Sequence, residues 1–209
     1  WGAPIAQKDH ARLACHASVE MSKRIIELED TWAAAGIPEL KVRMGLNSGP
    51  MVVGNMGSAQ RMNYTIMGDA VNLAARLEGA NKAYGSRMMI SDRTYQACKD
   101  HIDVRELDTI RVVGKKEAVT VYELLDKKNE TPSSLSELVV QFNDALAKYK
   151  DKDFLAAKNL FDNCLNIIAS DGPSRVYSER CALYLERPPP LDWDRVFTLT
   201  ENGLGMSVK

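Results

Sequence analysis

The sequence contains few of the residues that build metal sites and disulfide frameworks. Its 209 residues include three histidines and four cysteines, and no two cysteines form a Cys-x-x-Cys motif. Zinc sites and disulfide scaffolds need such clustering, so we exclude both and expect free thiols in a reducing compartment. The scattered cysteines are Cys15, Cys98, Cys164 and Cys181.

Long apolar runs and an excess of either charge are also absent. No apolar segment approaches the roughly 20 residues that a membrane helix needs, and the chain begins without a signal-peptide pattern. The formal net charge of −1 gives no support for nucleic acid or an anionic membrane surface as a partner. We therefore expect no nucleic-acid partner, and membrane contact only through a region upstream of this chain.

The most informative stretch is residues 63–78, which read NYTIMGDAVNLAARLE. A short strand pattern leads into a helix that is predicted to begin after the N-cap Asp69 and to stop at Gly85. Asn72 and Arg76 stand at positions i and i+4, so their side chains share one face of that helix. An amide and a guanidinium near a helix N-terminus, where the potential is positive, can together hold a phosphoryl group.

This stretch resembles the signature of the class III nucleotidyl cyclases, the adenylate and guanylate cyclase family. The resemblance extends upstream through RMGLNSG at residues 43–49, and downstream through VGKK at residues 113–116 and VYEL at residues 121–124. It covers residues 1–125. In that family the ribose 3′-oxygen attacks the α-phosphate in line and pyrophosphate leaves, so the protein must position the triphosphate and stabilise charge on the α-phosphoryl group.

The resemblance assigns roles to five residues. The catalytic pair would be Asn72 and Arg76: Arg76 would contact the α-phosphoryl oxygens and Asn72 would orient the ribose. Lys115 would bind the terminal phosphates as a mobile point charge, although a second lysine follows it and leaves the register open by one residue. Thr65 and Ile66 would bind substrate, and the threonine hydroxyl, which can donate and accept, favours adenine. From helix spacing alone, Arg76 paired with an acidic neighbour on the surface is the more ordinary interpretation.

No metal-binding residue is expected within this chain. The segment WGAP at residues 1–4 resembles the sequence that follows the family's second metal-binding aspartate. The resemblance therefore places both metal aspartates upstream of Trp1, with Mg²⁺ or Mn²⁺ as the cofactor of the complete domain. It implies that this chain is a fragment that is inactive alone.

Alternating strand and helix patterns over residues 1–125 predict an α+β fold. By resemblance, this is the ferredoxin-like α/β sandwich of the class III cyclases without its N-terminal strand and metal hairpin. A long helix is predicted from His10 onward. Its apolar stripe is predicted to consist of Ala14, Ala17, Met21, Ile25 and Leu28.

A polar linker at residues 126–134 separates this part from a helical tail at residues 135–209. Two apolar stripes in the tail resemble one tetratricopeptide hairpin, and a third helix is expected after a break at residues 171–173. One such unit cannot bury its faces alone, so we expect it to pack against the preceding part or a second copy. Trp193 and Phe197 are predicted to hold the C-terminal segment against the core.

The leading hypothesis is an adenylate cyclase that converts ATP to 3′,5′-cyclic AMP and pyrophosphate in intracellular signalling. Its catalytic part would be cytoplasmic, and membrane anchoring of the full protein is left open. Its partner would be a second cyclase domain, either an identical copy or a complementing one. Two alternatives remain: a guanylate cyclase, and a non-catalytic regulatory or dimerisation module derived from a cyclase.

Overall fold

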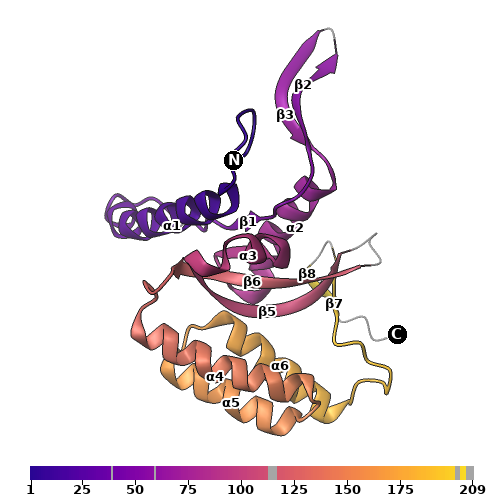
Figure 1. Ribbon diagram of the computed structural model, residues 1–209. Helices are drawn as coiled ribbons and strands as arrows, with labels where there is room; N and C mark the ends of the chain where they lie inside the picture. Colours follow the sequence, from indigo (N-terminus) through magenta and orange to yellow (C-terminus); the bar gives the residue numbers. More distant parts are fainter. Residues whose placement is uncertain (39, 59, 113–116, 201–202, 206–209) are drawn as a thin grey trace.

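A six-stranded mixed sheet organises the chain (Figure 1). The computed structural model describes residues 1–209 apart from 39, 59, 113–116, 201–202 and 206–209. In sheet order the strands are β1 (Met44–Leu46), β4 (Met88–Ser91), β6 (Ala118–Lys127), β5 (Ile102–Val112), β7 (Phe197–Thr200) and β8 (Gly203–Gly205). β1 pairs with β4 and β5 pairs with β7 in parallel, whereas the other neighbours are antiparallel. This mixture of sheet and helices agrees with the α+β prediction.

Helices cover both faces of the sheet, with α1 on one side and α4–α6 on the other (Figure 1). β4 shows how the faces divide. Met88 and Ile90 belong to the core shared with α1 and α3, whereas Met89 belongs to the core shared with α2 and α4–α6, as the two-residue period of a strand requires. The helices are α1 (His10–Ala34), α2 (Asp69–Tyr84), α3 (Asp92–Cys98), α4 (Ser133–Lys150), α5 (Phe154–Ile167) and α6 (Gly172–Glu186). A short 3-10 turn, Lys99–His101, leads from α3 into β5.

The buried face of α1 differs from the predicted stripe. Met21, which was expected to face the core, is 46% exposed. Apart from Val19, the side chains that α1 buries are small, being alanine, cysteine and serine. The buried residues are Ala11, Cys15, Ser18, Val19 and Ser22.

α2 begins one residue earlier than predicted. Gly68 is the N-cap, and Asp69 is the first residue of the helix, with no side-chain capping hydrogen bond. The predicted Asp69 cap was therefore wrong, although a carboxylate in the first turn still lies near the positive end of the helix. At the other end Gly85 adopts the left-handed conformation with φ of 68°, as predicted for a helix stop.

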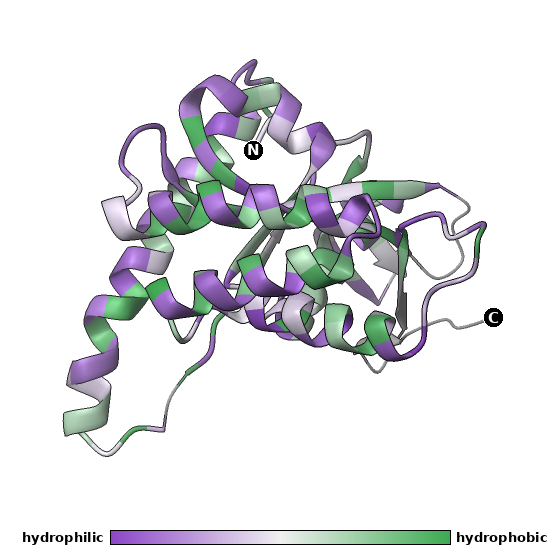
Figure 2. Ribbon diagram, turned by 90° about the horizontal axis from the view of Figure 1, so that it is seen from below, coloured by the Kyte–Doolittle hydropathy of each residue, from purple (hydrophilic) through white to green (hydrophobic). Residues whose placement is uncertain are grey.

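The helical tail packs against the sheet and shares one core with it. Phe142, Phe161 and Tyr177 belong to the same buried cluster as Leu77 of α2 and Leu107 of β5. The tail was predicted to pack against the preceding part of the chain or against a second copy, and in this structure it packs against the preceding part. Figure 2, which looks at the tail from below, shows hydrophilic and hydrophobic residues interleaved along its helices, as expected for amphipathic helices with one buried face.

The predicted break at residues 171–173 is instead the start of α6. Asp171 caps the helix by accepting a hydrogen bond from the Ser174 amide at 3.0 Å. Proline is tolerated in the first turn because its missing N–H has no partner there in any case. Trp193 packs at ring-centroid distances of 5.4 Å from Tyr149 and Tyr184, and Phe197 is buried, so both hold the C-terminal segment as predicted.

Two buried arginines join the tail to the sheet. Arg105 of β5 donates to Asp171 at 2.9 Å and to Glu123 at 3.0 Å. Arg180 of α6 donates to Asp108 of β5 at 2.6 Å. Burial raises the pKa of Glu123, and the Arg105 charge opposes that rise. Such pairs are costly to break because each partner would leave a buried charge behind.

α2 also touches the tail directly, through two glycines. A Cβ on Gly172 would stand 2.3 Å from the Tyr84 carbonyl oxygen and 2.9 Å from the Gly85 Cα. Because both obstacles are backbone atoms, only glycine allows the end of α2 to meet the start of α6 this closely.

A two-stranded hairpin projects away from the sheet (Figure 1). Its strands are β2 (Val52–Ser58) and β3 (Arg61–Met67). We call this hairpin the arm. It carries exposed apolar side chains, among them Val52 at 65%, Met62 at 61% and Tyr64 at 61% exposed. A surface of this kind is typical of a segment that packs against another chain.

Candidate functional site

α2 is held against β1 by a close backbone approach. A Cβ on Gly45 would stand 2.3 Å from the Ala74 carbonyl oxygen and 2.3 Å from the Glu78 amide nitrogen, so glycine is required there. The fully buried Asn81 then donates to the Met44 carbonyl at 3.0 Å. These contacts fix the position of α2, and with it the direction in which its exposed face points.

A cavity of about 530 Å³ opens beside the N-terminal half of α2. Asn72 and Arg76 both line it, which agrees with their predicted position on one helix face. The other walls come from the loop after β1, the start of α3 and the start of β6. Besides Asn72 and Arg76, the polar and charged side chains that line the cavity are Asp69 at the start of α2, and Asn47, Ser48, Ser91, Arg93 and Glu117 from the other walls.

A hydrogen-bond network connects the three elements around this cavity. Asn47 donates to the Ala70 carbonyl in the first turn of α2 at 2.9 Å, and Ser91 donates to the Asn47 side-chain oxygen at 2.7 Å. Ser91 also caps α3 by accepting from the Thr94 amide at 3.3 Å. The starts of α2 and α3 are thus hydrogen-bonded through the same asparagine, which fixes the distance between these two walls of the cavity.

Sequence reasoning missed the residues of this network. Asn47, Ser91 and Arg93 were not among the predicted site residues. Asn47 lies within the RMGLNSG motif at residues 43–49, which was the available signal. An asparagine side chain that bridges two elements is indistinguishable in sequence from a turn asparagine, since both follow a strand and precede glycine.

Two of the predicted substrate-binding residues, Thr65 and Ile66, do not line this cavity. Thr65 and Ile66 stand on β3 of the arm, where Thr65 is exposed and Ile66 is 47% exposed. Lys115 lies outside the described residues. Within one chain, the structure therefore brings together Asn72 and Arg76 but leaves Thr65 and Ile66 apart from them.

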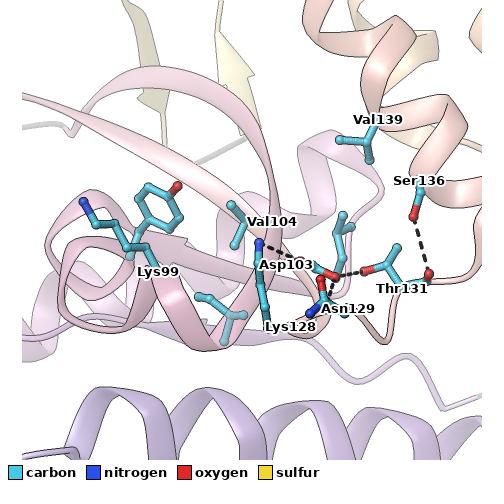
Figure 3. A pocket seen from close by; sticks show the side chains of 11 residues that line it. Lys99, Asp103, Val104, Lys128, Asn129, Thr131, Ser136 and Val139 are labelled. Atoms are coloured by element: carbon cyan, nitrogen blue, oxygen red, sulfur yellow. Dashed lines mark hydrogen bonds and ion pairs between the residues drawn. The ribbon is translucent and has the colours of Figure 1, made fainter.

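A second cavity of about 510 Å³ lies where α3, β5 and the start of α4 meet (Figure 3). Its central carboxylate, Asp103, already accepts from the Asn129 amide at 2.9 Å and the Thr131 hydroxyl at 3.0 Å, and it pairs with Lys128 at 3.1 Å. Burial raises the pKa of Asp103, but Lys128 and Thr131 outweigh it and hold the pKa below the usual range. These contacts occupy Asp103 in fixing the turn before α4, so we assign this cavity a structural role.

Two features are absent from the part of the chain that the structure describes. It contains no group of three or more histidine, cysteine, aspartate or glutamate side chains that could hold a metal ion. Its helices also include none that is both long enough and apolar enough to cross a membrane.

Comparison with known proteins gives a consistent result. Residues 2–126 match the family model of the adenylate and guanylate cyclase catalytic domain. Adenylate cyclase 1 of Rhizobium meliloti is 38% identical over 125 residues, which is 60% of this chain and 19% of that protein. The terminal-differentiation-specific adenylate cyclase of Dictyostelium discoideum is 32% identical over 170 residues, which is 78% of this chain and 8% of that protein. The chain thus spans less than a fifth of the length of either relative.

Solved structures agree with these sequence relatives. The adenylyl cyclase CyaB from P. aeruginosa superposes with a TM-score of 0.56 at 36% identity, covering 63% of this chain and 68% of that one. The guanylyl cyclase Cya2 gives a TM-score of 0.57 at 32% identity, covering 62% of this chain and 65% of that one. The chain belongs to the adenylate and guanylate cyclase catalytic domain family, the class III nucleotidyl cyclases. The predicted family and α+β fold class are thereby confirmed.

Proposed function

We propose that this chain is the catalytic portion of an adenylate cyclase, which converts ATP to 3′,5′-cyclic AMP and pyrophosphate. The observation that carries the proposal is the cavity lined jointly by Asn72 and Arg76 on one face of α2. The adenylate cyclases among its relatives support the choice of reaction.

The reaction assigns a role to each residue. The ribose 3′-oxygen attacks the α-phosphorus, loses its proton, and the bond from that phosphorus to the bridging oxygen of the β-phosphate breaks. Arg76 stabilises the charge on the α-phosphoryl oxygens, and Asn72 orients the ribose. Lys115 binds the terminal phosphates, whereas Thr65 and Ile66 contact the adenine.

Mg²⁺ or Mn²⁺ would accompany the nucleotide and neutralise part of its phosphate charge when bound. The described residues contain no group of three or more histidine, cysteine, aspartate or glutamate side chains that could hold such an ion. Each role assigned to this chain is therefore a contact between a side chain and the nucleotide. The side chains that bind the metal would come from outside the described residues.

A second cyclase domain, identical or complementing, is part of the proposal. The exposed apolar side chains of the arm support it, because a second domain that covered them would remove apolar surface from water, which is favourable. A partner that packs along the arm would also bring its own groups to Thr65 and Ile66, which the cavity of a single chain leaves outside.

A complementation assay tests the proposal. The chain would be mixed with the P. aeruginosa cyclase domain whose own counterpart of Arg76 is replaced by alanine, and cyclic AMP and pyrophosphate would be measured. We expect the chain to restore activity, and Arg76→Ala to remove it by about 10²–10³-fold, the usual effect of losing one preorganised donor. Arg24→Ala on α1, an exposed arginine paired with Glu27, is the control and should leave activity intact. Full activity with Arg76→Ala would refute the role of Arg76.

A second candidate is guanylate cyclase, which the similarity to Cya2 favours. The same assay with GTP decides between them, since the proposed adenylate cyclase should make little cyclic GMP. A third candidate, a non-catalytic dimerisation module, predicts no product from either nucleotide and no binding of ATP in calorimetry.

A further inference from the structure

The start of α3 brings a second arginine to the cavity that Asn72 and Arg76 line. Arg93 stands in the first turn of α3 and is part of the cavity wall. Its Nη1 atom lies 3.8 Å from the point where a Cβ on Gly49 would stand. The guanidinium therefore lies beside the loop that follows β1, and the same point on Gly49 is 2.7 Å from the Cβ of Ala70 in the first turn of α2.

Arg93 has no competing partner within the part of the chain that the structure describes. It makes no hydrogen bond or ion pair with any residue that the structure describes, and its side chain is exposed. In contrast, Arg43 pairs with Glu78 at 3.2 Å and Arg87 pairs with Glu29 at 2.9 Å. The five donors of the Arg93 guanidinium are thus available to a ligand in the cavity.

The cavity lining depends on Arg93 for its charge balance. Among the described residues, its ionisable side chains are two arginines, Arg76 and Arg93, and two carboxylates, Asp69 and Glu117, which together are formally neutral. Without Arg93 these described residues would carry a formal charge of −1, which would oppose an anionic ligand. Of the two arginines, Arg76 is the one assigned to the α-phosphoryl group, so Arg93 has no assigned role.

The position of Arg93 is fixed relative to the catalytic helix. Ser91, two residues earlier, donates to Asn47, and Asn47 donates to the first turn of α2. This network prevents the start of α3 from moving away from α2 without breaking hydrogen bonds. The planar guanidinium that extends from this anchored backbone suits bidentate contact with phosphate oxygens.

We propose that Arg93 is a further substrate-binding residue, which contacts the phosphates of ATP beyond the one held by Arg76. This inference rests on the proposed function, because it assumes that a nucleoside triphosphate occupies the cavity. Loss of one hydrogen-bonded charge contact typically lowers affinity by roughly ten-fold or more.

Calorimetric titration of the whole chain with ATP and Mg²⁺, and separately with AMP, tests the proposal. We expect Arg93→Gln to weaken ATP binding about ten-fold and AMP binding less than two-fold, because AMP lacks the distal phosphates. Arg93→Lys should recover part of the loss, and Glu117→Gln should strengthen ATP binding by relieving the opposing charge. Lys99→Gln removes the same charge just beyond α3 but outside this cavity, and it should change neither affinity.

The outcomes separate this inference from the proposed function. If Arg76→Ala abolishes ATP binding but Arg93→Gln binds like Lys99→Gln, the role of Arg93 is refuted and the proposed function stands. An equal loss of AMP and ATP affinity in Arg93→Gln would refute the placement on the distal phosphates. If the unaltered chain binds no ATP, both the proposed function and this inference fail together. The melting temperature of each variant should match the unaltered chain, since every replaced side chain is exposed.

Discussion

Replacing Arg180 by leucine should destabilise the whole chain, because Arg180 joins the tail to the sheet from inside the core. Its side chain is 6% exposed and that of Asp108 is 4% exposed, and the two are 2.6 Å apart. The guanidinium also lies 3.5 Å from the centre of the Phe197 ring. In Arg180→Leu, the Asp108 carboxylate would keep only the Tyr84 hydroxyl at 2.6 Å and the Thr109 amide at 2.8 Å.

The expected cost follows from the charge left behind. Removing one partner of a buried ion pair typically costs about 3–5 kcal/mol, a large part of the roughly 5–15 kcal/mol by which a domain is stable. At about 2–4 °C per kcal/mol for a chain of this size, the melting temperature should fall by roughly 6–20 °C. Because tail and sheet share one core, we expect a single cooperative transition in circular dichroism rather than separate melting of the tail.

A double-mutant cycle separates the ion pair from lost packing. Asp108→Asn removes the buried negative charge. The loss of unfolding free energy in the double variant should therefore be at least about 2 kcal/mol smaller than the sum of the losses in the two single variants. Arg175→Leu is the matched control, an exposed arginine on the same helix, and should cost no more than about 0.5 kcal/mol. A cost of less than about 1 kcal/mol for Arg180→Leu, or strict additivity, would refute the reasoning.

Three further predictions follow from burial and close packing. Gly45→Ala should cost about 1–3 kcal/mol and weaken ATP binding, because its Cβ would meet backbone atoms of α2 at 2.3 Å; an unchanged melting temperature would contradict this. Burial raises the pKa of five of the seven tyrosines, and together with the Asp92 charge it raises the pKa of Tyr122 to about 12. Above about pH 10 the unfolded chain loses phenol protons that the folded chain keeps, so stability should be complete below that pH and fall as pH rises towards 12. Absorbance at 295 nm during alkaline titration should show these tyrosines ionising together with unfolding, and gradual ionisation in a folded chain would argue against their burial. All four cysteines are buried, so a thiol reagent should label them only after denaturation, and rapid labelling of the native chain would contradict the structure.

The helix that carries Asn72 and Arg76 was predictable because its determinants are local. A glycine stop, an i to i+4 spacing and a strand before it lie within consecutive residues, and the helix has nearly the predicted bounds. The one-residue error at Asp69 arose because Gly68 and Asp69 are both acceptable N-caps, and the choice depends on backbone geometry that composition does not reveal. The roles of the two side chains in catalysis remain predictions.

The face that α1 buries was not predictable from its apolar pattern. Both the predicted stripe and the observed one satisfy helical periodicity. The observed face contains alanine, cysteine, serine and Val19, and which of the two faces packs against the sheet depends on the shape of the opposite surface. The boundaries proposed at residues 125 and 134 also remain predictions, although β6 continues to Lys127 and α4 already begins at Ser133.

The amino-acid order alone was enough to identify the cyclase family and to place an amide and a guanidinium on one helix face, since both depend on residues a few positions apart. The remaining walls of the cavity come from segments distant in the chain, namely the loop with Asn47 and the first turn of α3 with Arg93. They meet because Gly45 lets α2 approach β1 and because Ser91 and Asn47 bond the helix starts together. Such contacts depend on three-dimensional packing between residues distant in sequence. Only the tertiary structure therefore determines them, and the same is true of the single core that the tail shares with the sheet.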